Sequence, residues 1–343
     1  MIEVKQLTKR YGDITAIQDV SFRVEKGEIL GFLGPNGAGK TTTMRILTGF
    51  IPATSGTATV AGYEVFEQPM EVKRRIGYLP EQPPLYNELT VTEYLKFVGR
   101  IKGLPRQKLP DALDRVIERT GLKEVRGRLV GNLSRGFRQR VGLAQAMIHE
   151  PEVLILDEPT VGLDPKQIIE VRQLIKQQAG ERTVILSSHI LPEVTATCQR
   201  IVIIHEGKVV AVDTQEHLSA QLRRSDKIGL RIHRATPDLL SKLQAIPGVL
   251  HVFQEPVFTG SPMGAPDGQY YLVESQMDRD VREELARCVV SQGCGLLELK
   301  SLSMTLEEVF LRLTTEERDS QGTDRQGHGM GGPHGIEIEG EQA

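Results

Sequence analysis

The sequence has little cysteine and no long apolar run. Its three cysteines, Cys198, Cys288 and Cys294, are too few for a disulfide framework and too far apart for a four-ligand zinc site. Such low cysteine usage indicates a reducing compartment. No stretch of about 18 apolar residues occurs, and the N-terminal segment lacks the apolar core of a signal peptide. We therefore expect a cytoplasmic chain that does not itself span a membrane.

Positive charge is not in excess either. Lys and Arg total 42 against 45 Asp and Glu, which gives a net charge of −3 at pH 7. This balance offers no general attraction to phosphates of nucleic acid, so no nucleic-acid partner is expected. The length of 343 residues suits one large domain and a smaller one.

The pattern of apolar residues predicts an α/β fold. Residues 28–34, EILGFLG, form an apolar run that ends in glycine, as expected of a buried strand that leads into a phosphate loop. From about 86 to 147 apolar residues recur at three- and four-residue spacing, as in helices. Strand patterns return at 152–159, 183–188 and 200–213. We therefore expect residues 1–220 to form one α/β domain with a helical subdomain inserted at about 86–147.

The last third of the sequence has a different pattern. Strand and helix signals alternate, which predicts a small accessory α+β domain over residues 221–315. Within it, residues 304–314 have the apolar spacing of one amphipathic helix. The tail at 316–343 is polar and rich in glycine, so we expect it to be disordered.

A phosphate-binding loop is the strongest chemical signal. Residues 34–42, GPNGAGKTT, satisfy the phosphate-loop pattern. Glycines let successive backbone N–H groups turn toward phosphate oxygens, and the N-terminus of the following helix adds to the attraction. We expect Lys40 to reach the β- and γ-phosphates and the Thr41 hydroxyl to bind Mg²⁺. The predicted nucleotide-binding residues are Gly34, Pro35, Asn36, Gly37, Ala38, Gly39, Lys40, Thr41 and Thr42.

Two adjacent carboxylates supply the second half of a nucleotide site. Residues 153–159, VLILDEP, predict an interior strand whose carboxyl end carries Asp157 and Glu158, at the edge where α/β sheets bind their ligands. Asp157 is expected to hold Mg²⁺ through its water shell, and Glu158 to polarise an attacking water. Together with the phosphate loop, this pair predicts a Mg²⁺–nucleotide site in which Lys40 and Glu158 are catalytic.

Further motifs indicate the class of nucleotide-binding protein. LSRGFRQR, residues 133–140, lies shortly before VLILDEP, and in this setting the sequence resembles the ATP-binding cassette (ABC) ATPases, whose signature loop has this place and form. The resemblance covers residues 1 to about 215. Tyr11 matches the aromatic residue that stacks on adenine, Asp164 in VGLD matches the D-loop, and His189 in LSSHI matches the switch histidine. The resemblance therefore implies a P-loop NTPase fold of the ABC cassette type, with His189 as a third catalytic residue.

The resemblance also implies a dimer. In the family, two cassettes pack head to tail with two ATPs between them, and the signature loop binds the γ-phosphate of the ATP held by the partner. Ser134, Arg135, Gly136 and Asp164 are thus expected to bind ATP in trans. Ser134 also suits the N-cap of the following helix, and the two roles are compatible. Both a homodimer and a pairing with a similar cassette fit the sequence.

Two segments depart from the commonest family pattern. The usual signature is Leu-Ser-Gly-Gly-Gln, whereas Arg135 and Phe137 replace the first Gly and the Gln. Similar versions are familiar in one branch, the ABC-2 type exporters that resemble the gliding-motility ATPase. In GYLPEQPPLY, residues 77–86, Glu81 occupies the place of the Q-loop glutamine and Gln82 follows it. Either Glu81 or Gln82 is therefore a candidate to approach Mg²⁺.

The resemblance implies a transport function. We interpret the chain as the ATP-binding and ATP-hydrolysing subunit of an ABC-2 type exporter, in which ATP-driven dimer closure powers a separate transmembrane permease. It would then lie on the inner face of the plasma membrane, held by the permease. The alternative is a soluble ABC ATPase that acts as a nucleotide switch on a non-membrane partner. A two-cassette translation factor and a coiled-coil DNA-repair ATPase are disfavoured, because the sequence has one phosphate loop and no long heptad repeat.

Overall fold

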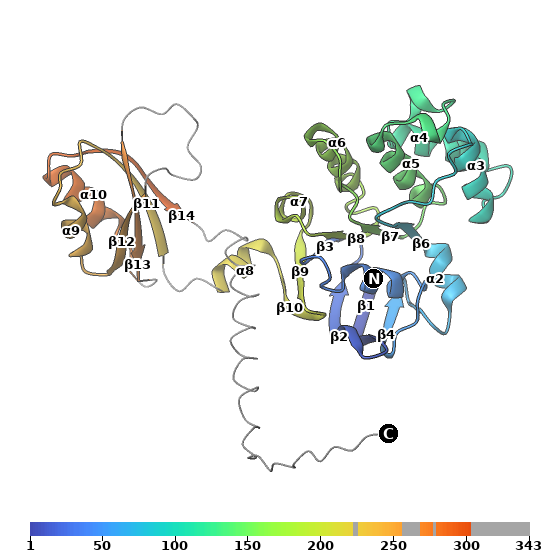
Figure 1. Cartoon of the computed structure of the whole chain (residues 1–343), viewed down its shortest axis with the longest axis horizontal. Coiled ribbons are helices and arrows are strands. Elements are labelled where there is room, and N and C mark those ends of the chain that lie inside the picture. The colour runs from blue at the N-terminus through green and yellow to red at the C-terminus, as the bar shows by residue number, and fades with distance from the viewer. Residues whose placement is uncertain (222–225, 256–267, 277–278, 303–343) are drawn as a thin grey trace, which may run out of the picture.

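The computed structural model describes residues 1–221, 226–255, 268–276 and 279–302 (Figure 1). These residues form three β-sheets, of which two lie in the first 213 residues. The helix expected at 304–314 and the tail at 316–343 lie outside the described residues. Among the described residues, none of the helices is both long and apolar enough to cross a membrane.

A six-stranded sheet forms the centre of the N-terminal part. Its order is β10-β9-β3-β8-β7-β6, with five parallel strands and the antiparallel edge strand β10. All residues of its inner strands β3, β7 and β8 are buried, which explains their nearly continuous apolar sequences. The strand pattern at 200–213 is a hairpin of two strands. The strands are β3 (Ile29–Leu33), β6 (Ile76–Leu79), β7 (Val153–Asp157), β8 (Thr183–Ser188), β9 (Arg200–His205) and β10 (Lys208–Asp213).

A second, antiparallel sheet packs against the first through one helix. It has the order β2-β1-β4-β5, built from β1 (Ile2–Tyr11), β2 (Ile14–Val24), β4 (Ser55–Val60) and β5 (Tyr63–Glu64). Helix α1 (Lys40–Leu47) lies between the two sheets (Figure 1). Its buried Met44, Ile46 and Leu47 share one apolar core with residues of both sheets. Burial of α1 on two sides fixes the position of its N-terminus, where the phosphate loop ends.

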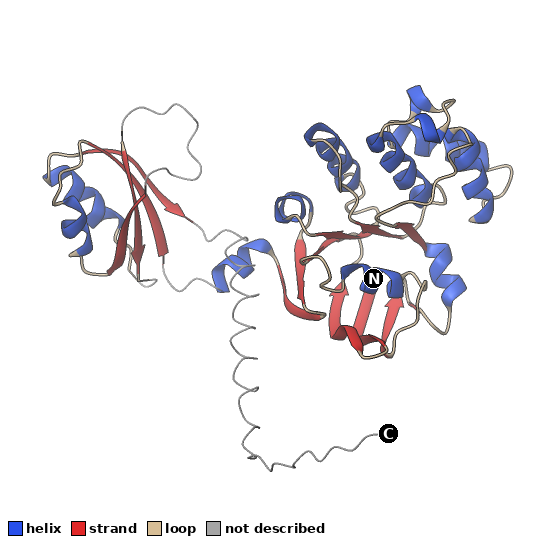
Figure 2. Cartoon of the chain, in the orientation of Figure 1, coloured by secondary structure: helices blue, strands red, loops and turns tan. Residues whose placement is uncertain are grey.

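Helices cover the other face of the central sheet (Figure 2). The predicted helical insertion contains α3 (Val91–Ile101), α4 (Leu109–Arg119) and α5 (Arg135–Met147), with two short 3₁₀ turns between α4 and α5. Thr90 and Glu93 form a reciprocal capping box that begins α3. Helix α2 (Pro69–Arg75) precedes β6, and α6 (Pro165–Lys176), α7 (Leu191–Thr197) and α8 (Gln215–Gln221) follow later strands. One core cluster joins the insertion and α6 to the sheet.

Residues 226–302 contain a separate four-stranded antiparallel sheet. The element order is strand, helix, strand, strand, helix, strand, and the sheet order is β12-β13-β11-β14, which is the ferredoxin-like arrangement. Both helices lie on one face of this sheet (Figure 2). The predicted alternation of strands and helices in this region is thus observed. The elements are β11 (Asp226–His233), α9 (Leu239–Gln244), β12 (Val249–Glu255), β13 (Gln269–Ser275), α10 (Arg282–Ser291) and β14 (Gly295–Leu302).

Two glycines give the phosphate loop its shape. Gly37 and Gly39 have φ angles of 81° and 103°, a conformation that side chains disfavour. A Cβ atom on Gly39 would lie 2.5 Å from Cγ2 of Ile17 and 2.8 Å from the carbonyl oxygen of Ala16. A Cβ atom on Gly37 would have no neighbour within 4 Å. Both positions therefore need glycine for backbone reasons, but only Gly39 needs it for space.

These two glycines provide a matched stability test. Each change to alanine carries a backbone cost of about 1–3 kcal/mol at positive φ. Gly39→Ala must also displace Ile17 or its neighbours, so we expect it to lower the thermal unfolding midpoint of the nucleotide-free chain further than Gly37→Ala does. Scanning fluorimetry without nucleotide measures both midpoints. Equal midpoints would contradict the close packing at Gly39.

Candidate functional site

A pocket of about 550 Å³ lies at the carboxyl ends of the central parallel strands. Nine predicted residues line it: Asn36, Gly37, Gly39, Lys40, Thr41, Thr42, Glu81, Glu158 and His189. Ala16 and Val161 also line it, and neither was among the predicted site residues. Parallel strands β3, β7 and β8 thus bring the phosphate loop, the acidic pair and His189 to one edge of the sheet.

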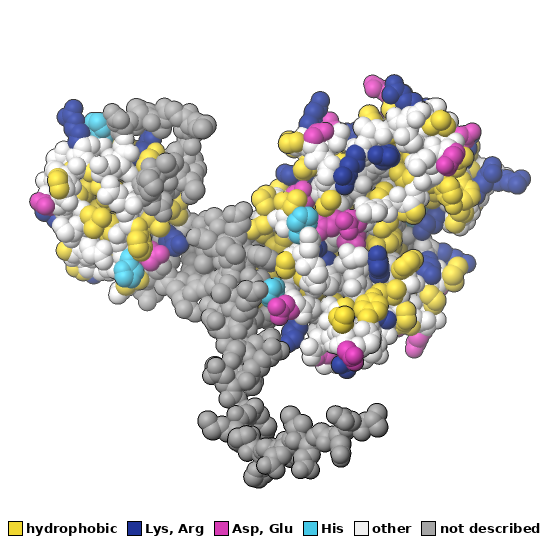
Figure 3. Space-filling model, viewed as in Figure 1, with side chains coloured by type: hydrophobic (Ala, Val, Ile, Leu, Met, Phe, Trp, Pro, Cys, Tyr) yellow, Lys and Arg dark blue, Asp and Glu magenta, His cyan; other side chains and the backbone are white. Residues whose placement is uncertain are grey.

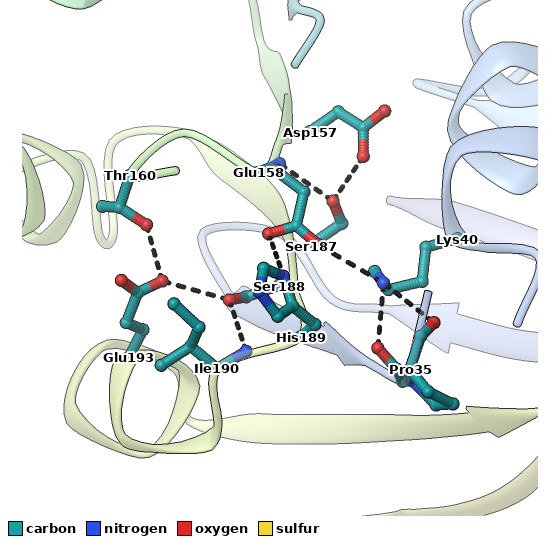
Figure 4. A network of polar contacts seen from close by, with 11 residues as sticks. Pro35, Lys40, Asp157, Glu158, Thr160, Ser187, Ser188, His189, Ile190 and Glu193 are labelled. Carbon is teal, nitrogen blue, oxygen red and sulfur yellow. Dashed lines mark hydrogen bonds and ion pairs between the residues drawn. The ribbon is translucent and has the colours of Figure 1, made fainter. Parts of the chain in front are cut away.

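The Lys40 ammonium group lies inside the phosphate loop. Its Nζ donates to the carbonyl oxygens of Gly34 at 2.8 Å and Pro35 at 3.1 Å, and it lies 3.3 Å from Oε1 of Glu158 (Figure 4). Both side chains of this ion pair are more than nine-tenths buried. Charges that are removed from water need such partners, so the loop carbonyls and Glu158 together hold the lysine in place.

Asp157 is fully buried at the end of β7. Its Oδ1 accepts a hydrogen bond of 2.5 Å from the Ser187 hydroxyl, while its buried Oδ2 has no hydrogen-bond partner among the described residues. Burial raises the pKa of Asp157, and the nearby Glu158 acts in the same direction. The hydrogen bond from Ser187, the nearby Thr41 hydroxyl and the Lys40 charge lower that pKa. A carboxylate oxygen without a partner, close to the Thr41 hydroxyl, is a donor set that suits Mg²⁺.

Glu158 connects the lysine to the histidine. Its φ of 49° is uncommon for a residue other than glycine, and its N–H donates to both the carbonyl oxygen and the hydroxyl of Ser187, at 3.2 and 3.0 Å. Oε2 of Glu158 lies 3.0 Å from Nδ1 of His189, which follows the end of β8. The carboxyl group is therefore held between Lys40 on one side and His189 on the other (Figure 4).

Several polar residues around this pair were missed by sequence reasoning. Ser187 supports both Asp157 and Glu158, and Thr160, Ser188 and Glu193 form a buried hydrogen-bonded group behind them. The hydroxyls at the end of TVILSS, next to the matched histidine, were the available signal for the two serines. Glu193 gave no comparable signal, because a glutamate in the first turn of a helix is usually exposed.

The structure separates the two candidates at the Q-loop position. Both side chains are exposed, but only Glu81 lines the pocket. Tyr11, the predicted adenine-stacking residue, lies at the end of β1, is 48% exposed and does not line the pocket. The Lys9 ammonium group lies 5.1 Å from the centroid of its ring. About half of the Tyr11 side chain is thus accessible to a ligand, and Lys9 lies over its ring.

The signature segment lies apart from the pocket of its own chain. Ser134 is the N-cap of α5, where its hydroxyl accepts from the N–H of Phe137 at 3.4 Å. Gly136 and Asp164 line a second pocket, of about 500 Å³, together with residues of α5 and α6. None of Ser134, Arg135, Gly136 and Asp164 lines the first pocket. The phosphate loop and the signature segment are therefore two separate surfaces of one chain.

Arg135 contacts the D-loop segment. A Cβ atom on Gly162 would lie 2.2 Å from Cζ of Arg135, so the guanidinium group covers this glycine. Gly162 also has a φ of 71°. The arginine that departs from the usual signature thus ties the beginning of α5 to the loop that follows the acidic pair.

Comparison with known proteins identifies the arrangement. The family model described as ABC transporter matches residues 17–161. The chain is 43% identical over 226 residues to the bacitracin transport ATP-binding protein BcrA of Bacillus licheniformis, covering 65% of this chain and 73% of that protein. It is 33% identical over 316 residues to the linearmycin resistance ATP-binding protein LnrL of Bacillus subtilis (strain 168), covering 92% of this chain and 98% of that protein.

A solved structure of a dimeric bacterial ABC transporter cassette is also similar. It superposes with a TM-score of 0.57 at 26% identity, covering 62% of this chain and 98% of that one. The match confirms the predicted cassette fold, to which the strand-rich region after residue 226 is added. With its phosphate loop, Glu158 and His189 lining one pocket, the chain belongs to the family of ABC transporter ATP-binding proteins, and it is the subunit that binds and hydrolyses ATP.

Proposed function

We propose that the chain powers an ABC-2 type exporter, of the branch that resembles the gliding-motility ATPase. The signature LSRGF, with its arginine and aromatic residue, supports this branch. Among the relatives, one is named for bacitracin transport and another for linearmycin resistance. Moving a compound out of the cell would account for both names, and we propose the same direction of transport here.

The pocket supports hydrolysis by positioning and charge stabilisation. In this proposal Lys40 turns from its loop carbonyls to the β- and γ-phosphates of ATP, because those oxygens are stronger acceptors for its ammonium group. Glu158 orients the attacking water and His189 contacts the γ-phosphate. Thr41, Asp157 and Glu81 would hold Mg²⁺, which would neutralise charge on the phosphates. The buried Asp157 oxygen without a partner is the observation that supports the metal.

The separation of the two surfaces supports a head-to-tail dimer. Ser134, Arg135, Gly136 and Asp164 do not line the pocket of their own chain, so they are free to complete the pocket of a partner. Ser134 and Arg135 are exposed at the N-terminus of α5, and such termini attract phosphate, whereas Gly136 is buried beside the Gln167 side chain. We propose that Tyr11 stacks on the adenine. The partner is a second copy of this chain or a similar cassette.

An apolar surface over α3 supports a permease partner. Tyr86, Phe97 and Ile101 are 52%, 41% and 67% exposed, and apolar side chains gather over this helix in Figure 3. The rings of Tyr86 and Phe97 lie 5.4 Å apart. This patch continues the segment that carries Glu81, so a partner bound there would contact the same loop that lines the pocket. Binding to a permease at this patch would hold the chain on the inner face of the membrane.

The exporter proposal is tested with a Glu158→Gln variant. Loss of the carboxylate should lower the ATPase turnover about 10²- to 10⁴-fold, while ATP binding remains, because the amide keeps the shape of the side chain. We expect the tagged variant, purified from its native cell with Mg²⁺ and ATP, to carry a multi-span permease. Recovery of a soluble partner without a permease would instead support the nucleotide-switch alternative.

The Q-loop position is tested by a pair of neighbouring changes. Glu81→Ala should raise the Mg²⁺ concentration needed for half-maximal ATP hydrolysis about 10- to 100-fold, as loss of a group near a metal does. Gln82→Ala should change it little, because Gln82 does not line the pocket. Magnesium titrations of the ATPase rate compare the two variants. The reverse order of effects would assign the role to Gln82.

A further inference from the structure

A buried carboxyl group lies behind the catalytic pair. Glu193, on α7, accepts hydrogen bonds at its Oε2 from the hydroxyls of Thr160 at 2.5 Å and Ser188 at 3.0 Å (Figure 4). The Ser188 hydroxyl accepts in turn from the N–H of Ile190 at 3.0 Å. Thr160, Ser188 and Glu193 are all more than nine-tenths buried. One oxygen atom therefore joins three segments of the chain.

The three segments are those that present the catalytic side chains. Thr160 is two residues after Glu158, in the turn that follows β7. Ser188 is the last residue of β8 and directly precedes His189. Glu158 and His189 contact each other at 3.0 Å between Oε2 and Nδ1. The hydrogen bonds of Glu193 thus fix both chain segments close to the place where these two side chains meet.

Stability alone does not account for a carboxyl group here. Its second oxygen, Oε1, is buried and has no hydrogen-bond partner among the described residues. Burial of an unsatisfied polar atom is unfavourable, and apolar residues of similar size fill such positions without that cost. Polar groups retained at a cost are expected where the geometry of a site depends on them.

We propose that Glu193 is a positioning residue for ATP hydrolysis, which holds Glu158 and His189 in register through Thr160 and Ser188. The inference rests on the roles proposed above for Glu158 and His189. Glu193 itself does not line the pocket and would touch neither ATP nor the attacking water. Its loss should therefore lower the turnover rate without weakening ATP binding.

The test measures steady-state ATP hydrolysis by the purified full chain. Glu193→Ala should lower kcat about 10²-fold, as expected when a catalytic group moves by about 1 Å, with KM for ATP within about threefold of the unmodified value. Glu193→Gln should stay within about tenfold of the unmodified kcat, because its amide oxygen can still accept from both hydroxyls. Thr160→Val removes one of the two donors and should have an intermediate effect.

A double variant separates positioning from general destabilisation. In a His189→Ala background, Glu193→Ala should cost much less than about 10²-fold, because one of the groups it positions is already absent. A full, multiplicative loss would overturn the proposal, as would an unchanged kcat in Glu193→Ala. Retention of activity by both Glu158→Gln and His189→Ala would instead overturn the proposed catalytic roles, independently of Glu193.

Thr120→Val is the matched control for Thr160→Val. Thr120 is equally buried, and its hydroxyl donates to the carbonyl oxygen of Val116 at 2.6 Å, at the end of α4 in the helical insertion. Both changes remove one buried hydroxyl, so both should lower the thermal unfolding midpoint. Only Thr160→Val should lower kcat. Equal effects of the two variants on kcat would show that Thr160 acts through stability alone.

Discussion

The parallel pairing of β3, β8 and β7 is the constraint on which the site depends. Leu33 pairs with Ser188 and Asp157 with Ser187, so the three strands end level at one edge of the sheet. Each strand is followed by a residue or loop to which we assign a role in the proposed mechanism. A shift of one residue in either pairing would turn alternate side chains to the opposite face of the sheet. The strands are buried on both sides, which makes such a shift costly.

The polar groups at this edge form one connected set. Lys40 contacts Glu158, Glu158 contacts His189, and the Ser187 hydroxyl contacts both acidic residues through Asp157 Oδ1 and the Glu158 N–H. In an interior of low polarity such contacts are strong, and a missing partner is correspondingly unfavourable. The set is therefore best regarded as one unit, whose members take their positions from one another as well as from the backbone.

Much of this arrangement could be predicted from the sequence, for identifiable reasons. The phosphate loop and the acidic pair are local motifs attached to apolar runs, so neither needs knowledge of distant contacts. Strand β4 was missed because SGTATV is weakly apolar, and its place in a sheet depends on pairing with β1. The choice between Glu81 and Gln82 and the burial of Glu193 depend on tertiary packing, which no local pattern reports. The domain boundaries stay a prediction, as does the in trans role of the signature residues.

The contact between Arg135 and Gly162 bears on how these loops can diverge among related chains. Position 162 is restricted by its φ angle of 71°, whereas the guanidinium group beside it is the far end of a flexible side chain and can move away. Replacement of Arg135 by glycine, as in the commonest signature, leaves the backbone restriction in place. Residue 135 can therefore change in evolution, whereas residue 162 should remain glycine whether position 135 carries arginine or glycine.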